Sequence, residues 1–219
     1  MRNASCLIAA FVLVMFTVSA ASGAFIDITR PGDPIEVENG FNQSDGDAGP
    51  PPAAEGVENA INDIGQKYLN FLDLSSGFRV TPSANPGNLP VTGLRLYTAN
   101  DSEVRDPASF QLLGSNDSIN GPWDAIASGN LALPEGRNEG GNTVAIPPAG
   151  NLGAFHQEVT FENELPYDHY RLVFPTLKDA AAANSMQIAE VELLVVPEPS
   201  SLALLGLGML TLVGLRRKN

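Results

Sequence analysis

The stretch VTGLRLYTANDSEVRDPASFQLLGSND, residues 91–117, indicates the fold class most clearly. In its first part Leu94 and Leu96 alternate with Arg95 and Tyr97, the period of two expected for a strand with one buried face. A polar segment containing Asp and Pro follows, and SFQLL at residues 109–113 begins a second apolar run. Two short β-type runs joined by turn residues predict neighbouring antiparallel strands.

The same kind of short run recurs on both sides of this stretch, between clusters of Pro, Gly, Asn and Asp. The further runs are residues 35–37, 78–81, 123–127, 155–161, 170–174 and 186–196. Between the two ends of the chain, only residues 57–64 and 178–184 have a helical pattern. The sequence therefore predicts an all-β fold, an antiparallel β-sandwich.

The composition excludes several classes of protein. The 219 residues include 12 Lys and Arg against 25 Asp and Glu, for a formal charge of −13, and only one Cys. Phosphate neutralisation by basic side chains supplies most of the affinity of nucleic-acid binders, so we expect no nucleic-acid partner. A single Cys excludes a disulfide framework and any Cys-based zinc site.

The N-terminus has the features of a secretory signal peptide, which we assign to residues 1–24. Arg2 precedes an uncharged apolar stretch at residues 7–18, and small residues follow, with cleavage sites after Ala20 or Ala24. The alternative is a first transmembrane helix, but the stretch is shorter than the roughly 20 residues that span a bilayer. We therefore expect an exported protein.

The C-terminus combines three features in its last 23 residues. Pro197, Glu198 and Pro199 stand before an uncharged apolar run, SSLALLGLGMLTLVGL at residues 200–215, which predicts a single hydrophobic helix. The basic residues Arg216, Arg217 and Lys218 follow and should stay on the cytoplasmic side of a membrane, with the body of the protein outside. The alternative is a buried core helix, which an all-round apolar run favours less.

This tripartite tail resembles the PEP-CTERM sorting signal of Gram-negative bacteria that produce exopolysaccharide. The resemblance implies an exosortase as partner, a membrane protease that cuts near the motif and passes the protein outward. Each Pro ring fixes φ and disfavours helix in the residue before it, so the motif should be extended and able to enter a protease cleft. We expect the protein to be membrane-anchored before processing and then to lie at the cell surface or in the extracellular matrix.

The charge is unevenly distributed between these ends and the body. Four of the basic residues and one acidic residue, Glu198, lie in the two terminal segments, so the body carries about −16. Such a charge keeps a protein soluble and attracts cations.

The body, residues 25–196, resembles discoidin-like (coagulation-factor type C) domains over its core, residues 55–195. The resemblance rests on GVENAINDIGQKYLNF at residues 56–71, on the stretch 91–117 with Trp123 after it, on YRLVF at 170–174, and on MQIAEVELL at 186–194. It implies a galactose-binding-like jelly roll, whose members often bind glycans or cell surfaces. The turn at residues 62–66 is one residue shorter than the turn usual in that family.

Many relatives hold a structural Ca²⁺ at this turn. The resemblance implies Asn62, Asp63, Gln66 and Glu190 or Glu192 as its ligands, and Ca²⁺ prefers such oxygen donors. Glu190 and Glu192 should share one face of a strand, with Ala189 and Val191 on the other. The alternative is that both glutamates are solvated strand residues.

A few other residues could contact a ligand. Trp123 could stack on a sugar ring, although a lone Trp in a β-sandwich more often belongs to the core. Arg105 lies between Asp101 and Asp106 and should form a local ion pair. The ligand-binding residues cannot be selected from the sequence; the exposed aromatic candidates are Tyr68, Phe155, His156 and Tyr167.

No pattern of a catalytic site stands in the chain. It lacks Gly-x-Ser-x-Gly, His-Glu-x-x-His and a Gly-rich phosphate loop, and its two His residues have no partner pattern. We therefore expect a non-enzymatic envelope or matrix protein that binds exopolysaccharide. The alternatives are a structural biofilm-matrix protein without a specific ligand and a glycan-active enzyme with a site in the long loops.

Overall fold

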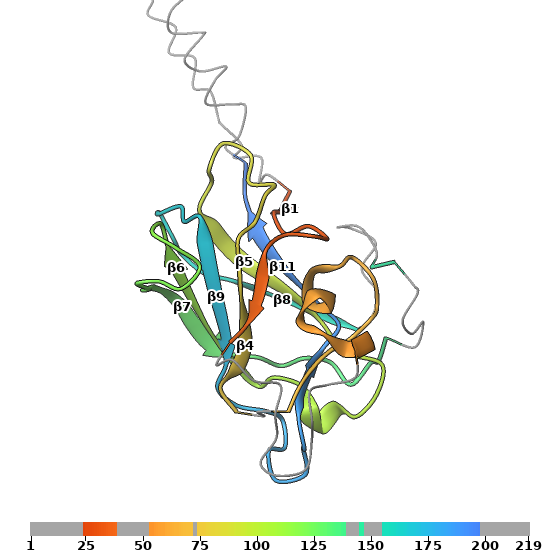
Figure 1. Ribbon diagram of the computed structural model, residues 1–219. Coiled ribbons are helices and arrows are strands. Elements are labelled where there is room, and N and C mark those ends of the chain that lie inside the picture. Colours follow the sequence, from red (N-terminus) through yellow and green to blue (C-terminus); the bar gives the residue numbers. More distant parts are fainter. Residues whose placement is uncertain (1–23, 39–52, 72–73, 139–144, 147–154, 198–219) are drawn as a thin grey trace, which may run out of the picture. The chain divides into compact units, whose positions relative to one another are not determined.

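The computed structural model describes residues 24–38, 53–71, 74–138, 145–146 and 155–197. The expected signal peptide, the C-terminal apolar run and residues 39–52 lie outside these residues. Residues 24–197 form one compact unit. Figure 1 shows this unit as strands arranged in two layers.

One layer is a four-stranded sheet in the order β1-β11-β5-β8. Its strands are β1 (Ile26–Asp27), β11 (Glu190–Val195), β5 (Val91–Tyr97) and β8 (His156–Thr160). All three pairings are antiparallel. The last strand, β11, therefore lies inside the sheet, between β1 and β5.

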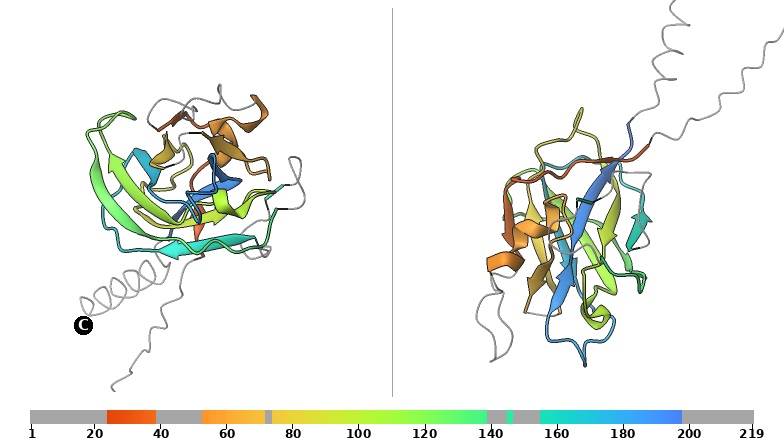
Figure 2. Two further views of the ribbon diagram at one scale, coloured as in Figure 1. Left: turned by 90° about the horizontal axis from the view of Figure 1, so that it is seen from below. Right: turned by 90° about the vertical axis from the view of Figure 1, so that its right-hand side faces the viewer.

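The other layer is a five-stranded antiparallel sheet in the order β2-β4-β9-β6-β7. Its strands are β2 (Ile35–Val37), β4 (Ser76–Val80), β9 (His169–Phe174), β6 (Ser109–Ser115) and β7 (Asp124–Asn130). Figure 2 shows the two sheets facing each other, with the β6–β7 hairpin curling at one side. The N-terminal segment thus contributes a strand to each sheet.

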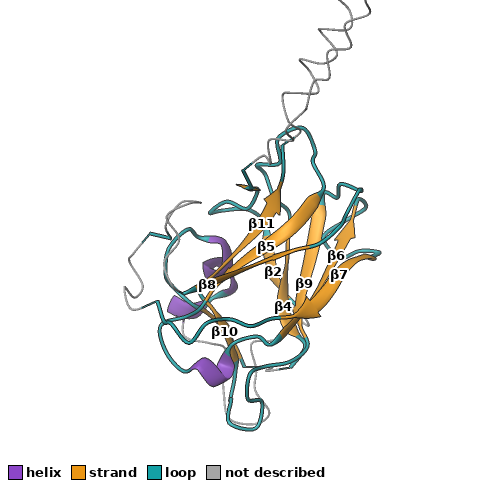
Figure 3. Ribbon diagram, turned by 180° about the vertical axis from the view of Figure 1, so that it is seen from behind, coloured by secondary structure: helices purple, strands orange, loops and turns teal. Residues whose placement is uncertain are grey.

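A two-stranded ribbon and three short 3₁₀ helices complete the described fold. The ribbon pairs β10 (Met186–Ile188) with β3 (Tyr68–Asn70). The helices are η1 (Ala53–Glu55), η2 (Val57–Ile61) and η3 (Glu103–Arg105). Figure 3 shows them grouped on the side away from β6 and β7.

The core fills the space between the sheets, because alternate residues of each strand point inward. Leu94 and Leu96 of β5 lie beside Leu193 and Val191 of β11, their partners on the neighbouring strand. All four side chains are fully buried. The largest fully buried side chains are Tyr68, Tyr97, Tyr170, Phe78, Phe174, Ile28, Ile61, Leu94, Leu96, Leu112, Leu172 and Met186. Each apolar side chain of this size contributes about 1.5–3 kcal/mol by leaving water.

The sandwich predicted from the sequence is confirmed, with differences in detail. Two strands were missed: β1 has only two residues, and the three residues of β3, Tyr-Leu-Asn, are all buried and do not alternate. The single run at 186–196 is two strands that separate at Ala189. Residues 57–64, predicted as helical, contain a 3₁₀ helix that ends at Ile61. The helix predicted at residues 178–184 is wrong, because the chain forms turns there.

Candidate functional site

The buried carboxylate of Glu190 organises the turn at residues 62–66. Glu190 is the first residue of β11, and its Oε2 accepts hydrogen bonds from the backbone N–H groups of Asn62 and Asp63, each at 3.1 Å. Asp63 has φ +60°, in the left-handed region that Asp and Asn tolerate better than most residues. This backbone conformation directs two successive N–H groups at one carboxylate oxygen.

The side chains of the same turn are bonded to one another. Asn62 Oδ1 accepts from the Ile64 N–H at 3.1 Å, and Asn62 Nδ2 donates to Asn59 Oδ1 at 3.1 Å and to Gln66 Oε1 at 3.3 Å. Gln66 Nε2 donates to the carbonyl of Ala54 at 2.8 Å. The structure therefore brings Asn62, Asp63, Gln66 and Glu190 together, as four of the five proposed calcium ligands.

The electrostatic environment of Glu190 favours a neutral carboxyl or a bound cation. Burial raises the pKa of Glu190 well above its ordinary value, and the nearby charges of Asp63, Asp27 and Glu192 raise it further. Burial also raises the pKa of Asp63. Glu190 Oε1 is buried and has no hydrogen-bond partner among the described residues. A buried oxygen without a partner, in a group of like charges, is costly unless a proton or a cation neutralises it.

These residues fit a calcium ion in part. Glu190 Oε2 is occupied by two N–H donors, so only Oε1 and the Asp63 carboxylate are free charged donors, and carbonyl and amide oxygens would have to complete the shell. Across the described ranges, no three His, Cys, Asp or Glu side chains converge closely enough to hold a metal. Calcium would therefore depend on oxygens of the turn at 62–66.

Glu192, the fifth proposed ligand, is engaged elsewhere. Its Oε2 accepts a hydrogen bond from Arg95, which lies directly across from Glu192 on β5. Arg95 Nη2 and Nε also donate to Glu158 Oε2 on β8, at 2.8 and 3.1 Å. The three side chains form a row across the sheet on the face away from the core. Only 4% of the Arg95 side chain and 8% of the Glu192 side chain are exposed.

The alternative prediction of solvated glutamates is wrong. Glu190 is 1% exposed and Glu192 is 6% exposed. They do share the strand face opposite Val191, as predicted. Alternation identifies the face that is not in the core, but it does not show whether another segment covers that face.

Two carboxylates of the loop at 98–108 anchor further segments. Asp106 is fully buried and binds Arg137 through both oxygens, at 2.9 and 2.7 Å, with the Lys178 ammonium at 3.1 Å. Lys67 lies 2.7 Å from Asp101. The expected ion pair of Arg105 forms with Asp101, at 3.9 Å. Reasoning from sequence missed Arg137 and Lys178, which lie too far along the chain from Asp106 for any local pattern to connect them.

The aromatic candidates divide into core and surface residues. Tyr68 and Tyr167 belong to the core. Phe155 and His156 are half-buried, with their ring centres 5.8 and 5.6 Å from that of Tyr97. Trp123 is half-buried and outside the core cluster, contrary to the more common placement of a lone Trp. Phe155, His156 and Trp123 thus remain as aromatic side chains that a ligand could reach.

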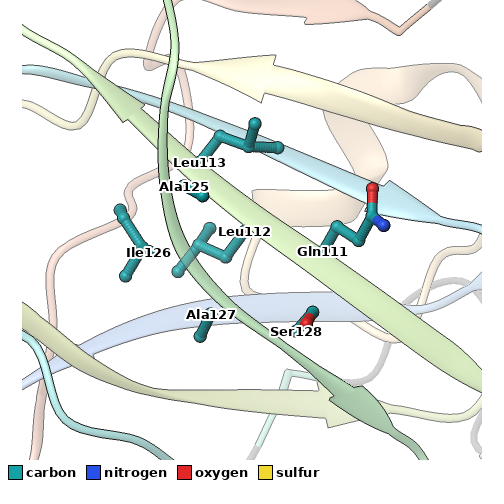
Figure 4. Close-up of a pocket in the computed structure, with 7 residues that line it drawn as sticks. All are labelled: Gln111, Leu112, Leu113, Ala125, Ile126, Ala127 and Ser128. Carbon is teal, nitrogen blue, oxygen red and sulfur yellow. The ribbon is translucent and has the colours of Figure 1, made fainter.

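The β6–β7 hairpin carries a shallow hollow of about 360 Å³, within the size range of small-ligand sites. Figure 4 shows its lining, in which Ile126 is the extra residue of a β-bulge opposite Leu112 and Leu113. The lining residues are Gln111, Leu112, Leu113, Ala125, Ile126, Ala127 and Ser128. None of these seven side chains titrates, so the hollow itself offers no acid or base for catalysis.

Of the sorting motif, only Pro197 is among the described residues. Glu198, Pro199, Arg216, Arg217 and Lys218 lie beyond them. Where the structure is described, it has no helix of the length and apolarity that a bilayer crossing needs.

Comparison with known proteins adds two findings. Residues 195–218 match the model of the PEP-CTERM protein-sorting motif, while no curated protein matches the chain. Solved structures with similar folds include F5/8 type C and CBM32 domains. The F5/8 type C domain of a Bacteroides fragilis protein is 12% identical, with a TM-score of 0.52, covering 80% of this chain and 98% of that one.

A second similar structure contains the CBM32-1, CBM32-2 and M60 catalytic domains of Clostridium perfringens ZmpB. It is 12% identical, with a TM-score of 0.51, and the match covers 79% of this chain and 15% of that one. At these identities the likeness concerns the fold. The body of this chain thus has a discoidin-like jelly-roll fold, and its last residues carry a PEP-CTERM sorting motif.

Proposed function

We propose that this protein is a non-enzymatic component of the cell envelope or extracellular matrix that binds exopolysaccharide. An exosortase processes it at its C-terminal tail. The main support for the proposal is that a PEP-CTERM motif directly follows a discoidin-like sandwich in the same chain. Export from a Gram-negative-type cell and anchoring by the apolar run before processing follow from the same motif.

Carbohydrate binding is supported by the fold and by the available surface. Discoidin-like domains often bind glycans, and this one leaves Phe155, His156 and Trp123 partly accessible, with a hollow on the β6–β7 hairpin. Aromatic faces with nearby amide and hydroxyl groups suit sugar rings. A glycan array probed with the full-length protein in detergent should show saturable binding to at least one class of glycan. Failure to bind any glycan would contradict the proposed carbohydrate binding.

Sorting should depend on the Pro-Glu-Pro motif. Replacing Pro197, Glu198 and Pro199 by alanine removes two Pro rings, whose fixed φ angles favour an extended backbone. In the host, the variant should accumulate as the full-length form in the membrane fraction, whereas the original protein is released; immunoblots of membrane and medium measure both. Replacing the adjacent Ser200 and Ser201 by alanine is the matched control and should leave release unchanged. Normal processing of the triple variant would contradict the sorting role.

We further propose that the turn at 62–66 and Oε1 of Glu190 hold a calcium ion. A ligand that binds only the folded state stabilises it by about 2.7 kcal/mol at 100 times its Kd. Excess calcium should therefore raise the melting temperature over that in chelator. Glu190→Gln should abolish this rise, because the amide removes the charge, while Glu192→Gln should keep it, because Glu192 faces Arg95. An equal melting temperature with calcium and with chelator would end the calcium proposal.

A further inference from the structure

Two polar side chains beside the hollow on the β6–β7 hairpin are available to a ligand. Gln111 of β6 and Ser128 of β7 lie directly across from each other, and both line the hollow. Both residues are exposed, and neither side chain makes a hydrogen bond to another described residue. Figure 4 shows them beside each other on the two strands. The amide and the hydroxyl therefore offer both donors and acceptors at the surface.

An apolar patch lies next to these two groups, as strand alternation dictates. Phe110 and Leu112 of β6 point into the core. Gln111 and Leu113, which alternate with them, therefore point outward. Leu113 is half-buried and pairs with the exposed Ala125 of β7. The hollow thus combines an apolar surface with a few polar groups, a composition that suits the C–H face and the hydroxyl groups of a sugar ring.

The charge at and around the hollow selects the class of sugar. None of the side chains that line it is charged. Arg171 of β9 lies directly across from Leu113, but its guanidinium donates to the buried carboxylate of Glu38. The body as a whole carries a net charge of about −16, which repels polyanions. These features favour an uncharged sugar over a uronic acid or a sulfated sugar.

The position of the hollow in the sheet indicates which part of a polysaccharide it contacts. β7 is the last strand of the five-stranded sheet, so the hollow lies at the edge of that sheet. Five of the seven residues of β7 are exposed. A pocket for a chain end encloses most of a sugar, whereas a shallow hollow at a sheet edge leaves the polymer room to continue on both sides.

We propose that this hollow binds an uncharged segment within the exopolysaccharide chain. Leu113 and Ala125 contact one face of a sugar ring, while Gln111 and Ser128 bond to its hydroxyl groups. The inference rests on the carbohydrate binding proposed above, and it adds the location of the site and the class of sugar. A longer fragment contacts more of the sheet face around the hollow, so it should bind more tightly than a single sugar.

The double variant Gln111→Ala with Ser128→Ala tests the site. Both positions are exposed, so the melting temperature should be unchanged. The full-length protein in detergent is titrated with the purified exopolysaccharide of the host, separated by anion exchange into an uncharged and an acidic fraction. The double variant should bind the uncharged fraction about tenfold more weakly, because two hydrogen bonds are lost. The matched control, Asn100→Ala with Thr160→Ala, changes two exposed polar residues outside the five-stranded sheet and should bind normally.

Fragments of the uncharged fraction, made by partial acid hydrolysis, should compete better as they become longer. Equal binding by the original protein and the double variant would overturn this site and leave the proposed carbohydrate binding intact. Binding of the acidic fraction alone would overturn the uncharged class of sugar, and equal competition by single sugars would overturn recognition within the chain. If the original protein binds neither fraction, the proposed carbohydrate binding is wrong and this inference fails with it.

Discussion

Replacing Arg95 by leucine is expected to lower the free energy of unfolding by about 3–5 kcal/mol, the largest effect that we predict for a single substitution. Arg95 lies between Glu192 and Glu158 in the row across β11, β5 and β8, and its side chain is only 4% exposed. Breaking a buried ion pair on one side leaves the other charge without compensation in a poorly solvated place. Urea unfolding followed by circular dichroism measures the change.

Two further variants separate the ion pair from general damage. The double variant Arg95→Leu with Glu192→Leu should regain much of the lost stability, since the buried Glu192 charge is removed together with its partner and the remaining Glu158 side chain is 32% exposed. Arg105→Leu removes a more exposed cation 3.9 Å from Asp101 and should cost less than about 1 kcal/mol. A loss below 1 kcal/mol for Arg95→Leu would show that the row of charges does not stabilise the sandwich.

The second large effect is a fall in stability as the pH rises from 5 to 7. Burial raises the pKa of Asp27 from 3.8 to about 7, although Thr29 donates two hydrogen bonds to it and Arg30 lies 3.2 Å away. In this range the folded state holds a proton that the unfolded state releases, so stability decreases with rising pH until the folded-state pKa is passed. Over these two pH units the free energy of unfolding should fall by about 2–3 kcal/mol.

Urea unfolding at several pH values in the presence of chelator measures this dependence, and Asp27→Asn isolates its source. The amide cannot ionise, so the variant should have a flatter profile and should be at least as stable as the original protein at pH 8. Glu190 and Glu192, whose pKa values are also raised by burial, should leave a residual slope of the same sign. Stability that rises between pH 5 and pH 7 would contradict a protonated Asp27 carboxyl in the folded state.

Much of the sandwich follows from local sequence because its long strands alternate regularly. β5 and β6 are the clearest cases, and turn residues mark where they end. β1 could not be predicted in this way, since two residues show no period and its formation depends on the presence of β11. The break at Ala189 is likewise set by tertiary pairing, because β10 and β11 pair with different strands.

The candidate site was only partly predictable, for a different reason. The resemblance to discoidin-like domains pointed to Asn62, Asp63, Gln66 and Glu190, and the structure brings these together. The burial of Glu192 and its pairing with Arg95 depend on strand register, which the sequence of one strand does not specify. The contact of Asp106 with Arg137 and Lys178 joins three separate loops.

The central claim is that the exported sandwich binds the polysaccharide made by its own host. The most direct test incubates the protein released from the host with that purified exopolysaccharide and sediments the polymer. A non-binding protein of similar size and charge serves as the control. We predict that the released protein sediments with the polymer in a saturable manner and that soluble polymer competes for it. Protein that stays in the supernatant at every polymer concentration, as the control does, would contradict the claim.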